Sequence, residues 1–443
     1  MPHRTHRLLL INPALACPGR KRRSVAGLAT MEPLGLAYVA ALTPPGWDIR
    51  IWDELYKDRP GDFQPDLVGI TSLTPTAPRA YEIATYWRAR GVPVVMGGMH
   101  ATLCPDEACR YVDAVFCGEA EGAWPQVIED FEHGQLQERY HGGAPDLANL
   151  PLPRRDLYRR KSRVSLINAS RGCRYRCEFC AIWKAEGARF RTRPIADVLA
   201  ELPHVPRGYA TLFTDANIYA DRDHARALFR AMASHGLRRR HVVQASLDIA
   251  DDDELLAALK ASGCFGVLIG LESLDEATLR AMRKGVNLRV GVEHYREKIE
   301  RLHAHGLIVA ATFIFGNDGE GPDAFERTAN FVLEARVDLA HFGLLVPTPG
   351  TDVFERLSRE GRLLFNDFPA SYALLDLNRA VFQPTDMTPE QAEAGLASAT
   401  QKVSTWPTAL RRAWRTWYAT GNASAALISL LWTRTGLRER VLG

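Results

Sequence analysis

The N-terminal third of the chain alternates short apolar runs with longer amphipathic stretches. The apolar runs have the length of buried strands and lie at residues 8–11, 49–52, 67–71, 92–96 and 114–117. Residues 35–42 and 80–90 repeat apolar side chains at helical spacing. Short β-rich runs that alternate with helices predict a parallel, doubly wound, Rossmann-like α/β sheet. Such a sheet binds ligands beyond the carboxyl ends of its strands.

The same alternation resumes at residue 164 and continues to residue 350. Strands are expected at 164–168, 210–214, 242–246, 266–270, 309–315 and 339–345. Helical stretches separate them, at 195–202, 222–235, 252–262, 275–283, 292–305 and 324–335. Repeated β/α units of this kind predict a partial (β/α)6 TIM barrel, with its site at the carboxyl ends of the strands.

A stretch rich in proline, glycine and charge, "HGGAPDLANLPLPRRDLYRR" (141–160), separates the two patterns and indicates a linker. Four parts are therefore expected, namely an N-terminal domain, a linker, a barrel and a mostly helical C-terminal cap, at 1–140, 141–163, 164–350 and 351–443. The last part interleaves arginines with aromatic residues at helical spacing, at Trp406, Trp414, Trp417, Tyr418 and Trp432. It fits helices packed on the barrel, a cap that contacts substrate, or a surface that lies on a membrane.

Composition narrows the classes of protein that need to be considered. The net charge of +3 is too close to zero to favour nucleic acid, and no apolar stretch is long enough for a membrane span. The basic, then apolar N-terminus resembles a signal peptide only until Asn12-Pro13, so a cytoplasmic location is expected. Five of the eight cysteines are scattered, which fits buried thiols in a reducing compartment, at Cys17, Cys104, Cys109, Cys117 and Cys264.

The other three cysteines, Cys173, Cys177 and Cys180, follow the first barrel strand in one short loop. Thiolates are the ligands that iron–sulfur clusters prefer, and three of them leave one iron of a four-iron cluster open for chemistry. A structural zinc site would usually need a fourth nearby ligand, and no cysteine or histidine at zinc-finger spacing follows. Arg171, Arg174, Arg176 and Lys184 would offset the charge of the thiolates.

Polar residues follow each expected barrel strand. Asp221, Asp251 and Asp275 are typical helix N-caps. Glu272 differs, because "GVLIGLES" places a carboxylate directly after a buried strand, where an unpaired charge would be costly. It needs a partner, such as the hydroxyls or the ammonium group of a bound nucleotide.

The cysteine loop "ASRGCRYRCEFCAIWK" (169–184), with an aromatic residue before the last cysteine, resembles the signature of the radical S-adenosylmethionine superfamily. "LFTDANIYAD", "QASLDIADDDELLAALKASGC", "GVLIGLESLDEATLRAMRKGVN" and "ATFIFGNDGE" resemble its second, fourth, fifth and sixth strands, in order. The resemblance implies a 4Fe–4S cluster on the three cysteines. It also implies that S-adenosylmethionine is contacted by Phe179, Asp215, Gln244, Ser246 and Glu272, with Asp215 facing its amino group.

Residues 8–130 resemble the cobalamin-binding domain that precedes many radical enzymes, through "PLGLAYVAAL", "DLVGITSLTPTAPRAYEIA", "VVMGGMHATLCPDEA" and "VDAVFCGEAEGAWPQVI". This implies cobalamin contacts at Pro33, Gly35, Thr71, Ser72, Gly97, Gly98, His100, Gly118 and Glu119. The Asp-x-His-x-x-Gly motif, whose histidine ligates cobalt in the wider group, is absent, and His100 does not fit it. Cobalamin is therefore expected without a histidine on cobalt; a domain that has lost the cofactor is the alternative.

The later half of the chain looks closest to cobalamin-dependent C-methylases that act on hopanoids and bacteriochlorophyll precursors. This resemblance implies that the cluster reduces S-adenosylmethionine to a 5′-deoxyadenosyl radical, which takes hydrogen from an unactivated carbon, while methylcobalamin supplies the methyl group. A large, mostly apolar small-molecule substrate and an external one-electron reductant of flavodoxin or ferredoxin type are expected. Non-methylating oxidation, cyclisation or rearrangement stays open. A cluster-bearing electron carrier or binding protein is more remote, because a carrier normally has a fourth cysteine.

Overall fold

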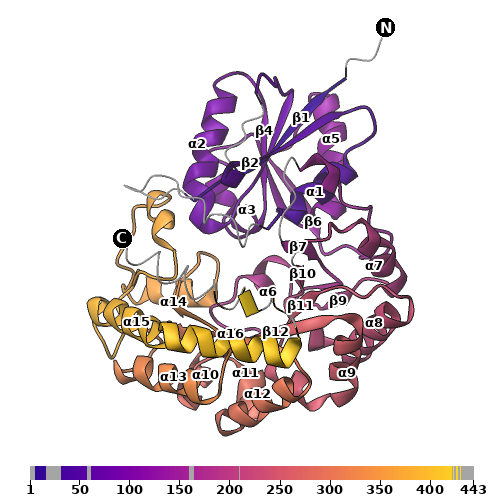
Figure 1. Ribbon diagram of the computed structural model, residues 1–443. Helices are drawn as coiled ribbons and strands as arrows, with labels where there is room; N and C mark the ends of the chain where they lie inside the picture. Colours follow the sequence, from indigo (N-terminus) through magenta and orange to yellow (C-terminus); the bar gives the residue numbers. More distant parts are fainter. Residues whose placement is uncertain are drawn as a thin grey trace.

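The computed structural model contains two parallel sheets, one in each half of the chain, and the N-terminal domain sits on top of the barrel (Figure 1). It describes residues 5–15, 31–56, 61–158, 164–208 and 210–421, and beyond them only isolated positions. Cys17 and Trp432 lie outside the described residues.

Six strands form the N-terminal sheet in the order β2-β1-β3-β4-β5-β6, and every neighbouring pair is parallel. They are β1 (Arg7–Asn12), β2 (Asp48–Asp53), β3 (Leu67–Thr71), β4 (Val94–Gly97), β5 (Ala114–Gly118) and β6 (Arg139–Gly143). The doubly wound sheet predicted from the pattern is confirmed. The strand β6 was not expected, and it extends into the segment assigned to the linker from residue 141.

Helices cover both faces of this sheet. They are α1 (Leu34–Leu42) and α5 (Trp124–Glu132) on one face, and α2 (Ala77–Arg88), α3 (Met99–Leu103) and α4 (Pro105–Ala108) on the other. Successive side chains of a strand point to opposite faces. Leu8 and Leu10 of β1 therefore enter one core, and Leu9 and Ile11 enter the other. This two-sided burial explains why the strand reads as an unbroken apolar run.

The second sheet has the order β14-β13-β12-β11-β10-β7 and is also parallel throughout. Its strands are β7 (Val164–Ile167), β10 (Ala210–Phe213), β11 (His241–Ala245), β12 (Cys264–Glu272), β13 (Ile308–Phe315) and β14 (Leu339–Leu344). The predicted partial (β/α)6 barrel is confirmed. The segments expected at the fourth, fifth and sixth strands form the third, fourth and fifth instead, because no described strand of this sheet lies between β10 and β11.

Seven helices cover the outside of the barrel within the described residues, α7 (Ile195–Glu201), α8 (Arg222–Ser234), α9 (Asp253–Ser262), α10 (Glu276–Ala281), α11 (Gly285–Val290), α12 (Tyr295–Ala304) and α13 (Asp323–Glu334). Asp221 and Asp275 cap α8 and α10 by accepting a backbone hydrogen bond, as expected. The cap of α9 is Asp252 and not Asp251. Asp251 pairs with Lys298 of α12 instead, at 2.5 Å.

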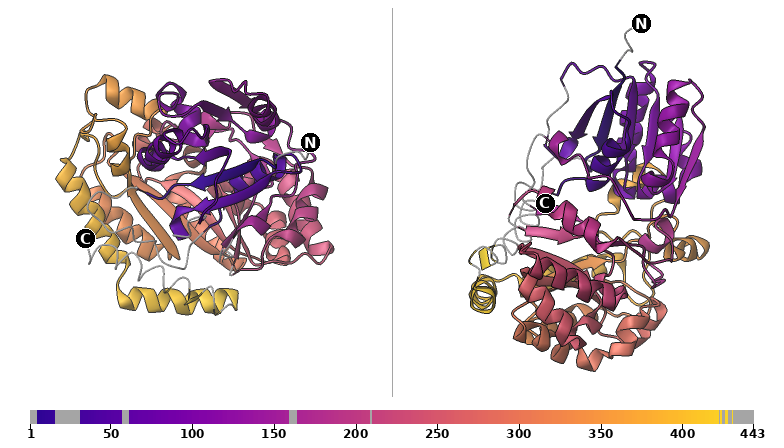
Figure 2. Two further views of the ribbon diagram at one scale, coloured as in Figure 1. Left: turned by 90° about the horizontal axis from the view of Figure 1, so that it is seen from above. Right: turned by 90° about the vertical axis from the view of Figure 1, so that its right-hand side faces the viewer.

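The C-terminal region contains α14 (Asp352–Arg359), the one-turn 3-10 helix η9 (Ala370–Leu374), α15 (Pro389–Val403) and α16 (Trp406–Thr420). η9 contacts α2 of the N-terminal domain, α15 packs on α13, and α16 lies along the side of the barrel (Figure 2). Within the described residues, no helix is long and apolar enough to cross a bilayer.

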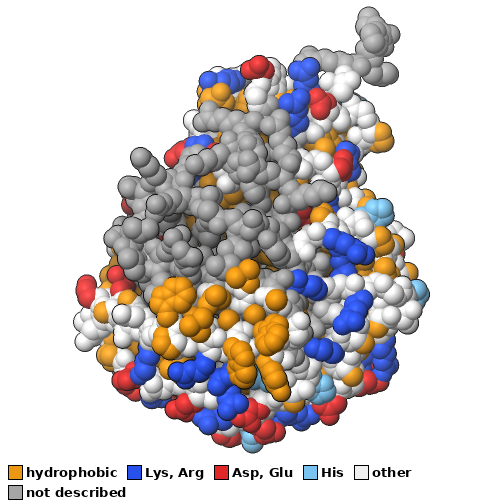
Figure 3. All heavy atoms as spheres, viewed as in Figure 1, with side chains coloured by type: hydrophobic (Ala, Val, Ile, Leu, Met, Phe, Trp, Pro, Cys, Tyr) orange, Lys and Arg blue, Asp and Glu red, His pale blue; other side chains and the backbone are white. Residues whose placement is uncertain are grey.

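The aromatic side chains of α16 face outward. The helix buries Ala409, Arg412 and Thr416, whereas its large apolar side chains are more than half exposed, at Trp406, Leu410, Trp414, Trp417 and Tyr418. Figure 3 shows hydrophobic side chains gathered over this helix. The described part of the tail thus forms helices, as expected, and the aromatic side chains of α16 are exposed rather than buried against the barrel.

Candidate active site

The three cysteines of the motif lie on one loop between β8 (Ser170–Arg171) and α6 (Ile182–Ala185). The Cys177 carbonyl accepts hydrogen bonds from the Cys180 N–H, at 3.1 Å, and from the Trp183 indole, at 3.0 Å. Gly172 has a φ of +82°, and a Cβ there would lie 2.3 Å from the Arg189 carbonyl. Only glycine fits at this entrance to the loop, because its backbone is left-handed and closely packed.

The ammonium group of Lys284 is the common electrostatic neighbour of the three thiols. Burial raises the pKa of each thiol, that of Cys177 to about 11, and the positive charge of Lys284 acts in the opposite direction at all three. Bound iron would lower the pKa of these thiols despite their burial, because a thiol that coordinates a metal is deprotonated. Lys284 is thus positioned to offset thiolate charge, a role that the sequence did not indicate.

Two of the cations expected to fill that role are paired with carboxylates instead. Arg171 contacts Glu119 at 2.7 Å and Glu121 at 2.6 Å. Lys184 contacts Asp352 at 2.6 Å. Arg174 and Arg176 are exposed on the loop.

Glu272, the last residue of β12, folds back over its own strand. Its φ is +66°, and its carboxylate accepts hydrogen bonds from Lys284 Nζ at 2.9 Å and from Thr312 Oγ1 at 3.1 Å. A Cβ on Gly270 would lie 2.1 Å from Glu272 Oε1, so the glycine makes room for the carboxylate. From the sequence, the partner of Glu272 was expected to be a group of a bound nucleotide. In the structure the partner is Lys284, because a buried carboxylate needs a permanent counter-charge.

Asp215, two residues after the end of β10, is fully buried beneath the strand that enters the cysteine loop. Its carboxylate accepts hydrogen bonds from the Ala169 N–H, at 3.2 Å, and from the Ser170 hydroxyl. Burial raises its pKa to about 6, against the effect of these hydrogen bonds. The expected contact with the amino group of S-adenosylmethionine does not fit this geometry, because the carboxylate is enclosed by donors of the chain.

Further polar groups surround the loop at the carboxyl ends of β11, β12 and β13. Ser246 accepts from Asn217 Nδ2 at 3.0 Å and donates to Asp248 at 2.5 Å, and Gln244 is half-buried on β11. The ring of Phe179 lies 5.8 Å from Lys284 Nζ.

Glu320 belongs to the same edge of the sheet. It accepts hydrogen bonds from the Ser273 hydroxyl at 2.9 Å and from the Asn317 amide group at 3.1 Å. Burial raises the pKa of Glu320 to about 7. The sequence did not single out this buried carboxylate, because it lies in a glycine-rich turn rather than directly after a strand.

The cysteine loop is fastened from the C-terminal side by α14. Arg356 contacts the Glu178 carboxylate at 2.7 Å, and the Val353 N–H donates to the Glu178 carbonyl at 3.2 Å. Asp352 contacts both Lys184, at 2.6 Å, and Arg283, at 2.7 Å. No sequence motif identifies these residues, because α14 reads as an ordinary amphipathic helix.

Two glycines that were expected to contact cobalamin have different surroundings, Gly98 directly after β4 and Gly35 in α1. Gly98 has a φ of +93°, and a Cβ there would lie 2.8 Å from the Ser72 nitrogen, so it is required by the packing of β3 against β4. A Cβ on Gly35 would meet no described atom within 4 Å. Gly35 is exposed at the start of α1, whose N-cap is Pro33. Thr71 and Gly97 end β3 and β4 and are partly exposed.

His100 is fully buried and belongs to a polar cluster inside the domain. Its Nε2 lies 2.9 Å from the Tyr81 hydroxyl and 3.3 Å from Glu107, and its Nδ1 lies 3.3 Å from the Thr74 hydroxyl. The assignment of His100 as a cobalamin contact does not fit this position, since both ring nitrogens have partners within the chain.

Glu119, after β5, connects the N-terminal sheet to the cysteine loop. It contacts Arg171 at 2.7 Å and also pairs with Arg191 of β9 (Arg191–Thr192). Its side chain is 8% exposed. Gly118, with a φ of +89°, allows the close approach of the Gly143 backbone beside it. Glu119 was expected to contact cobalamin, but its carboxylate forms ion pairs with these two arginines instead.

The arrangement fits the cofactors that the motifs indicated. Three thiols of one loop have the largely buried Lys284 as a common neighbour, and the N-terminal domain adjoins this loop through the Arg171–Glu119 contact. Within the described residues, no three His, Cys, Asp or Glu side chains are arranged to hold a single metal ion. Three thiolates on one loop suit the wider iron–sulfur cluster.

Comparison with known proteins identifies a family for each half of the chain, the barrel and the N-terminal domain. Residues 167–332 match the radical SAM superfamily and residues 26–128 match the B12 binding domain. The chain is 32% identical over 346 residues to bacteriochlorophyllide d C-12(1)-methyltransferase of Chlorobaculum tepidum, which covers 74% of each protein. It is 27% identical over 355 residues to the hopanoid C-2 methylase of Rhodopseudomonas palustris, which covers 76% of this chain and 66% of that protein.

Among solved structures, the radical S-adenosylmethionine methyltransferase TsrM from Kitasatospora setae, with cobalamin and a 4Fe–4S cluster bound, has the same fold. The TM-score is 0.72 at 17% identity, and the match covers 99% of this chain and 100% of TsrM. The fold and the cysteine loop thus define a radical S-adenosylmethionine enzyme. The chain belongs to the family of cobalamin-dependent radical S-adenosylmethionine methyltransferases, whose cofactors are S-adenosylmethionine, a 4Fe–4S cluster and cobalamin.

Proposed function

We propose that this enzyme methylates an unactivated carbon of an apolar small molecule held between the carboxyl ends of its two sheets. The observation that carries the proposal is the Arg171–Glu119 contact of 2.7 Å, which joins the cysteine loop to the strand end after β5. A substrate beside this contact lies within reach of both cofactor sites. The relatives named above, which act on a bacteriochlorophyllide and on a hopanoid, support an apolar substrate.

On the barrel side, Cys173, Cys177 and Cys180 hold the cluster, and Phe179, Gln244, Ser246 and Glu272 surround S-adenosylmethionine. When bound, these cofactors supply the means to remove a hydrogen atom from carbon, and cobalamin supplies the methyl group. Lys284 balances the thiolate charge and fixes Glu272. Asp215 acts through Ser170, whose position it determines, rather than by contact with the ligand.

On the other side, cobalamin lies against the strand ends of the domain assigned to residues 1–140. Pro33 and Gly35 border the open space at the start of α1, and Thr71, Ser72, Gly97, Gly98 and Gly118 form the wall along β3, β4 and β5. His100 stays inside the domain, where its ring nitrogens have partners, so it would not ligate cobalt.

The test is anaerobic reconstitution with iron, sulfide, S-adenosylmethionine and hydroxocobalamin, with a bacteriochlorophyllide and a hopanoid as separate trial substrates. Methyl transfer yields S-adenosylhomocysteine together with 5′-deoxyadenosine, and a product heavier by one methylene unit. If a trial substrate is changed and 5′-deoxyadenosine forms without S-adenosylhomocysteine, the enzyme catalyses a non-methylating radical reaction and the proposal is wrong.

The cluster needs an external one-electron reductant, and the exposed loop residues Arg174 and Arg176 support a small acidic electron carrier of the flavodoxin or ferredoxin type. Opposite charges on the two proteins would speed their encounter. Free thiols at Cys104, Cys109, Cys117 and Cys264 support a reducing compartment, the cytoplasm.

The outward face of α16 supports contact with an anionic membrane surface. The face carries exposed Trp414 and Trp417 beside exposed Arg411 and Arg415. The sequence has no Asp or Glu between Glu393 and Glu439, so nothing acidic in this part opposes the arginines. Amphipathic helices with aromatic and basic residues lie in the membrane interface, where an apolar substrate would also be found.

A further inference from the structure

Four buried charged side chains meet where the N-terminal domain joins the barrel. Arg155 begins the 3-10 helix η4 (Arg155–Leu157) of the linker. It pairs with Glu32, which precedes α1, and with Glu201 of α7, at 2.8 Å. Arg193, two residues before α7, pairs with Glu201 at 2.7 Å. Each of the four side chains is at most 5% exposed. These four residues are called the junction network below.

The barrel side of the junction network holds the strand that enters the cysteine loop. Arg155 donates to the Leu166 carbonyl of β7 at 2.6 Å. Arg193 donates to the Asn168 carbonyl, directly after β7, at 2.9 Å. The backbone N–H of Arg193 also donates to the Ala169 carbonyl at 2.8 Å. The two arginines therefore fix the backbone from which the cysteine loop starts.

The other side of the junction network is helix α1 of the N-terminal domain. Tyr38 of this helix donates to Glu201 at 3.1 Å, and the guanidinium group of Arg171 lies 5.6 Å from the centre of the Tyr38 ring. The Tyr158 hydroxyl of the linker donates to the Pro33 carbonyl at the start of α1, at 2.7 Å. The network therefore connects the helix beside the proposed cobalamin site with the loop that carries the three cysteines.

The physical chemistry of buried charges indicates what such a network contributes. Removing four charged groups from water costs free energy that their mutual attraction offsets only in part, and apolar side chains of similar volume often stabilise a protein equally well. Hydrogen bonds between guanidinium and carboxylate groups are directional, because the planar fork of an arginine fits a carboxylate in few geometries. The junction network therefore adds little stability and restricts α1 and β7 to one relative orientation.

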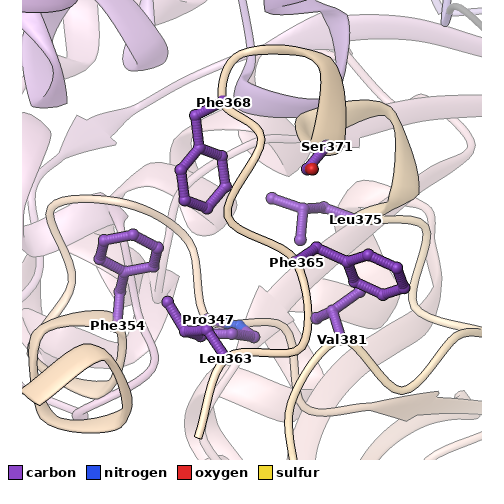
Figure 4. Close-up of a pocket in the computed structure, with 8 residues that line it drawn as sticks. All are labelled: Pro347, Phe354, Leu363, Phe365, Phe368, Ser371, Leu375 and Val381. Atoms are coloured by element: carbon purple, nitrogen blue, oxygen red, sulfur yellow. The ribbon is translucent and has the colours of Figure 1, made fainter. Parts of the chain in front are cut away.

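A second contact of the N-terminal domain, with the C-terminal region, is mainly apolar. Phe368 and Leu375 pack against the core that contains α2. Figure 4 shows these side chains beside Phe354 and Phe365, and the void that the group leaves is about 10 Å³, room for about one water molecule. Apolar packing is non-directional. This contact therefore adds buried area, and the orientation is determined at the junction network.

We propose that Arg155 is a positioning residue for methyl transfer, because it fixes α1 relative to the cysteine loop through Glu32 and Glu201. The Arg171–Glu119 contact already attaches the domain to this loop at the end of β5. One contact of this kind lets a domain turn about it, whereas a second contact on another element fixes its orientation. The proposal rests on the proposed placement of the two cofactors on either side of the junction, and Arg155 holds them in one relation.

The test compares the wild type with the double variant Glu32→Leu with Arg155→Met, both reconstituted anaerobically with the cluster and cobalamin. The double variant replaces one ion pair by apolar side chains and leaves Arg193 paired with Glu201, so it should fold. Electron paramagnetic resonance of cob(II)alamin and the reduced cluster measures the interaction between their spins. The wild type should show one resolved splitting, and the double variant should lose it to a broad signal.

Two further variants make this result specific. Arg155→Lys keeps the charge but cannot form the planar fork that reaches both carboxylates, so it should also lose the resolved splitting. Arg296→Met with Glu334→Leu replaces an exposed ion pair on the outside of the barrel and is the matched control, which should keep the splitting. Iron and cobalamin contents verify that each variant carries both cofactors.

The proposal is overturned if Arg155→Lys or the double variant carries both cofactors and has the wild-type splitting, or if the wild type shows no interaction between the two spins. It is also overturned if the control pair loses the splitting to the same extent. The reconstitution with trial substrates is a separate measurement. A wild type that shows the splitting but changes a trial substrate without forming S-adenosylhomocysteine would contradict methyl transfer and not the role of Arg155 at the junction.

Discussion

Arg356 of α14 contacts Glu178 of the cysteine loop at 2.7 Å, although the two residues are 178 positions apart in the chain. Glu178 stands between Cys177 and Cys180, two of the proposed cluster ligands, and its side chain is 12% exposed. Helix α14 of the C-terminal region therefore stabilises the cysteine loop through Glu178. Its contribution is to hold the geometry of the thiols.

Replacing Arg356 by alanine should weaken cluster retention. The largely buried Glu178 carboxylate would lose its counter-charge, at a cost of about 1–3 kcal/mol for a pair that water still reaches in part. Iron content after anaerobic gel filtration and the midpoint of thermal unfolding measure this effect. Arg359→Ala, at the exposed end of the same helix, is the control and should change neither. Equal iron contents in the two variants would contradict a supporting role for α14.

Each of Cys173, Cys177 and Cys180 should be required for the cluster, because each supplies one thiolate. Alanine at any of these positions should abolish the iron–sulfur absorbance and the cleavage of S-adenosylmethionine. Cys104→Ala and Cys109→Ala are matched controls from the N-terminal domain and should keep the full iron content. A complete cluster in Cys177→Ala would show that the loop does not hold it.

The double variant Arg174→Glu with Arg176→Glu should slow reduction of the cluster by flavodoxin. Reversing two exposed charges removes electrostatic steering, and the rate constant should fall about tenfold at low salt and less at high salt. Stopped-flow absorbance measures the rate. Photoreduced deazariboflavin, which needs no protein docking, should reduce both forms equally. The exposed pair Arg296→Glu with Arg327→Glu serves as the charge control. Equal slowing by both reductants would mean that the loop itself is damaged.

Glu320→Gln should change how stability depends on pH. The folded-state pKa of about 7 lies above the ordinary value of 4.5. Glu320 therefore favours the folded state fully below pH 4.5 and loses this effect as the pH rises through 7. Glutamine does not ionise. The free energy of unfolding of the variant, relative to that of the wild type, should therefore rise by about 2 kcal/mol between pH 5 and pH 8. Urea unfolding across this range measures the gain. Glu355→Gln, exposed on α14, should show none, and a parallel shift in both variants would refute the explanation.

Trp414→Ser with Trp417→Ser should reduce binding to vesicles of phosphatidylcholine and phosphatidylglycerol by about tenfold, because two aromatic anchors leave the interface. Flotation of the holoenzyme with the vesicles measures this binding. Tyr86→Ser removes an equally exposed aromatic residue from the N-terminal domain and should have no effect. Wild-type protein that floats neither with these vesicles nor with phosphatidylcholine alone would exclude the membrane contact.

Local patterns in the sequence were sufficient for the fold, and they predicted three cysteines as the ligands of a cluster. Leu8 to Ile11 read as a strand because burial on both faces selects apolar side chains at every position. The three cysteines could be predicted as ligands because one short loop carries them all, and the structure places them on one loop. Gly172 and Gly98 are also encoded locally, since left-handed backbone at a close contact requires glycine.

Tertiary structure alone decided which charged groups meet. Glu272 was recognised as a carboxylate that needs a partner, but the fold of α10 and α11 supplies that partner as Lys284. Glu119 and His100 follow strand ends of the kind that bind ligands in such sheets. Glu119 instead pairs with Arg171 and Arg191. His100 lies within hydrogen-bond distance of Tyr81, Thr74 and Glu107. The residues of each group come from different elements, and no pattern along one segment encodes the position of another.

The C-terminal region is the clearest case in which the sequence pattern predicts an element but not its contacts. Its helical periodicity predicted helices correctly but not which face would be buried. The aromatic side chains of α16 point outward, whereas Arg412 and Thr416 are buried. Periodicity determines that a helix has an apolar side. What covers that side depends on where the barrel and the N-terminal domain leave surface free, and this is settled only when the whole chain is folded.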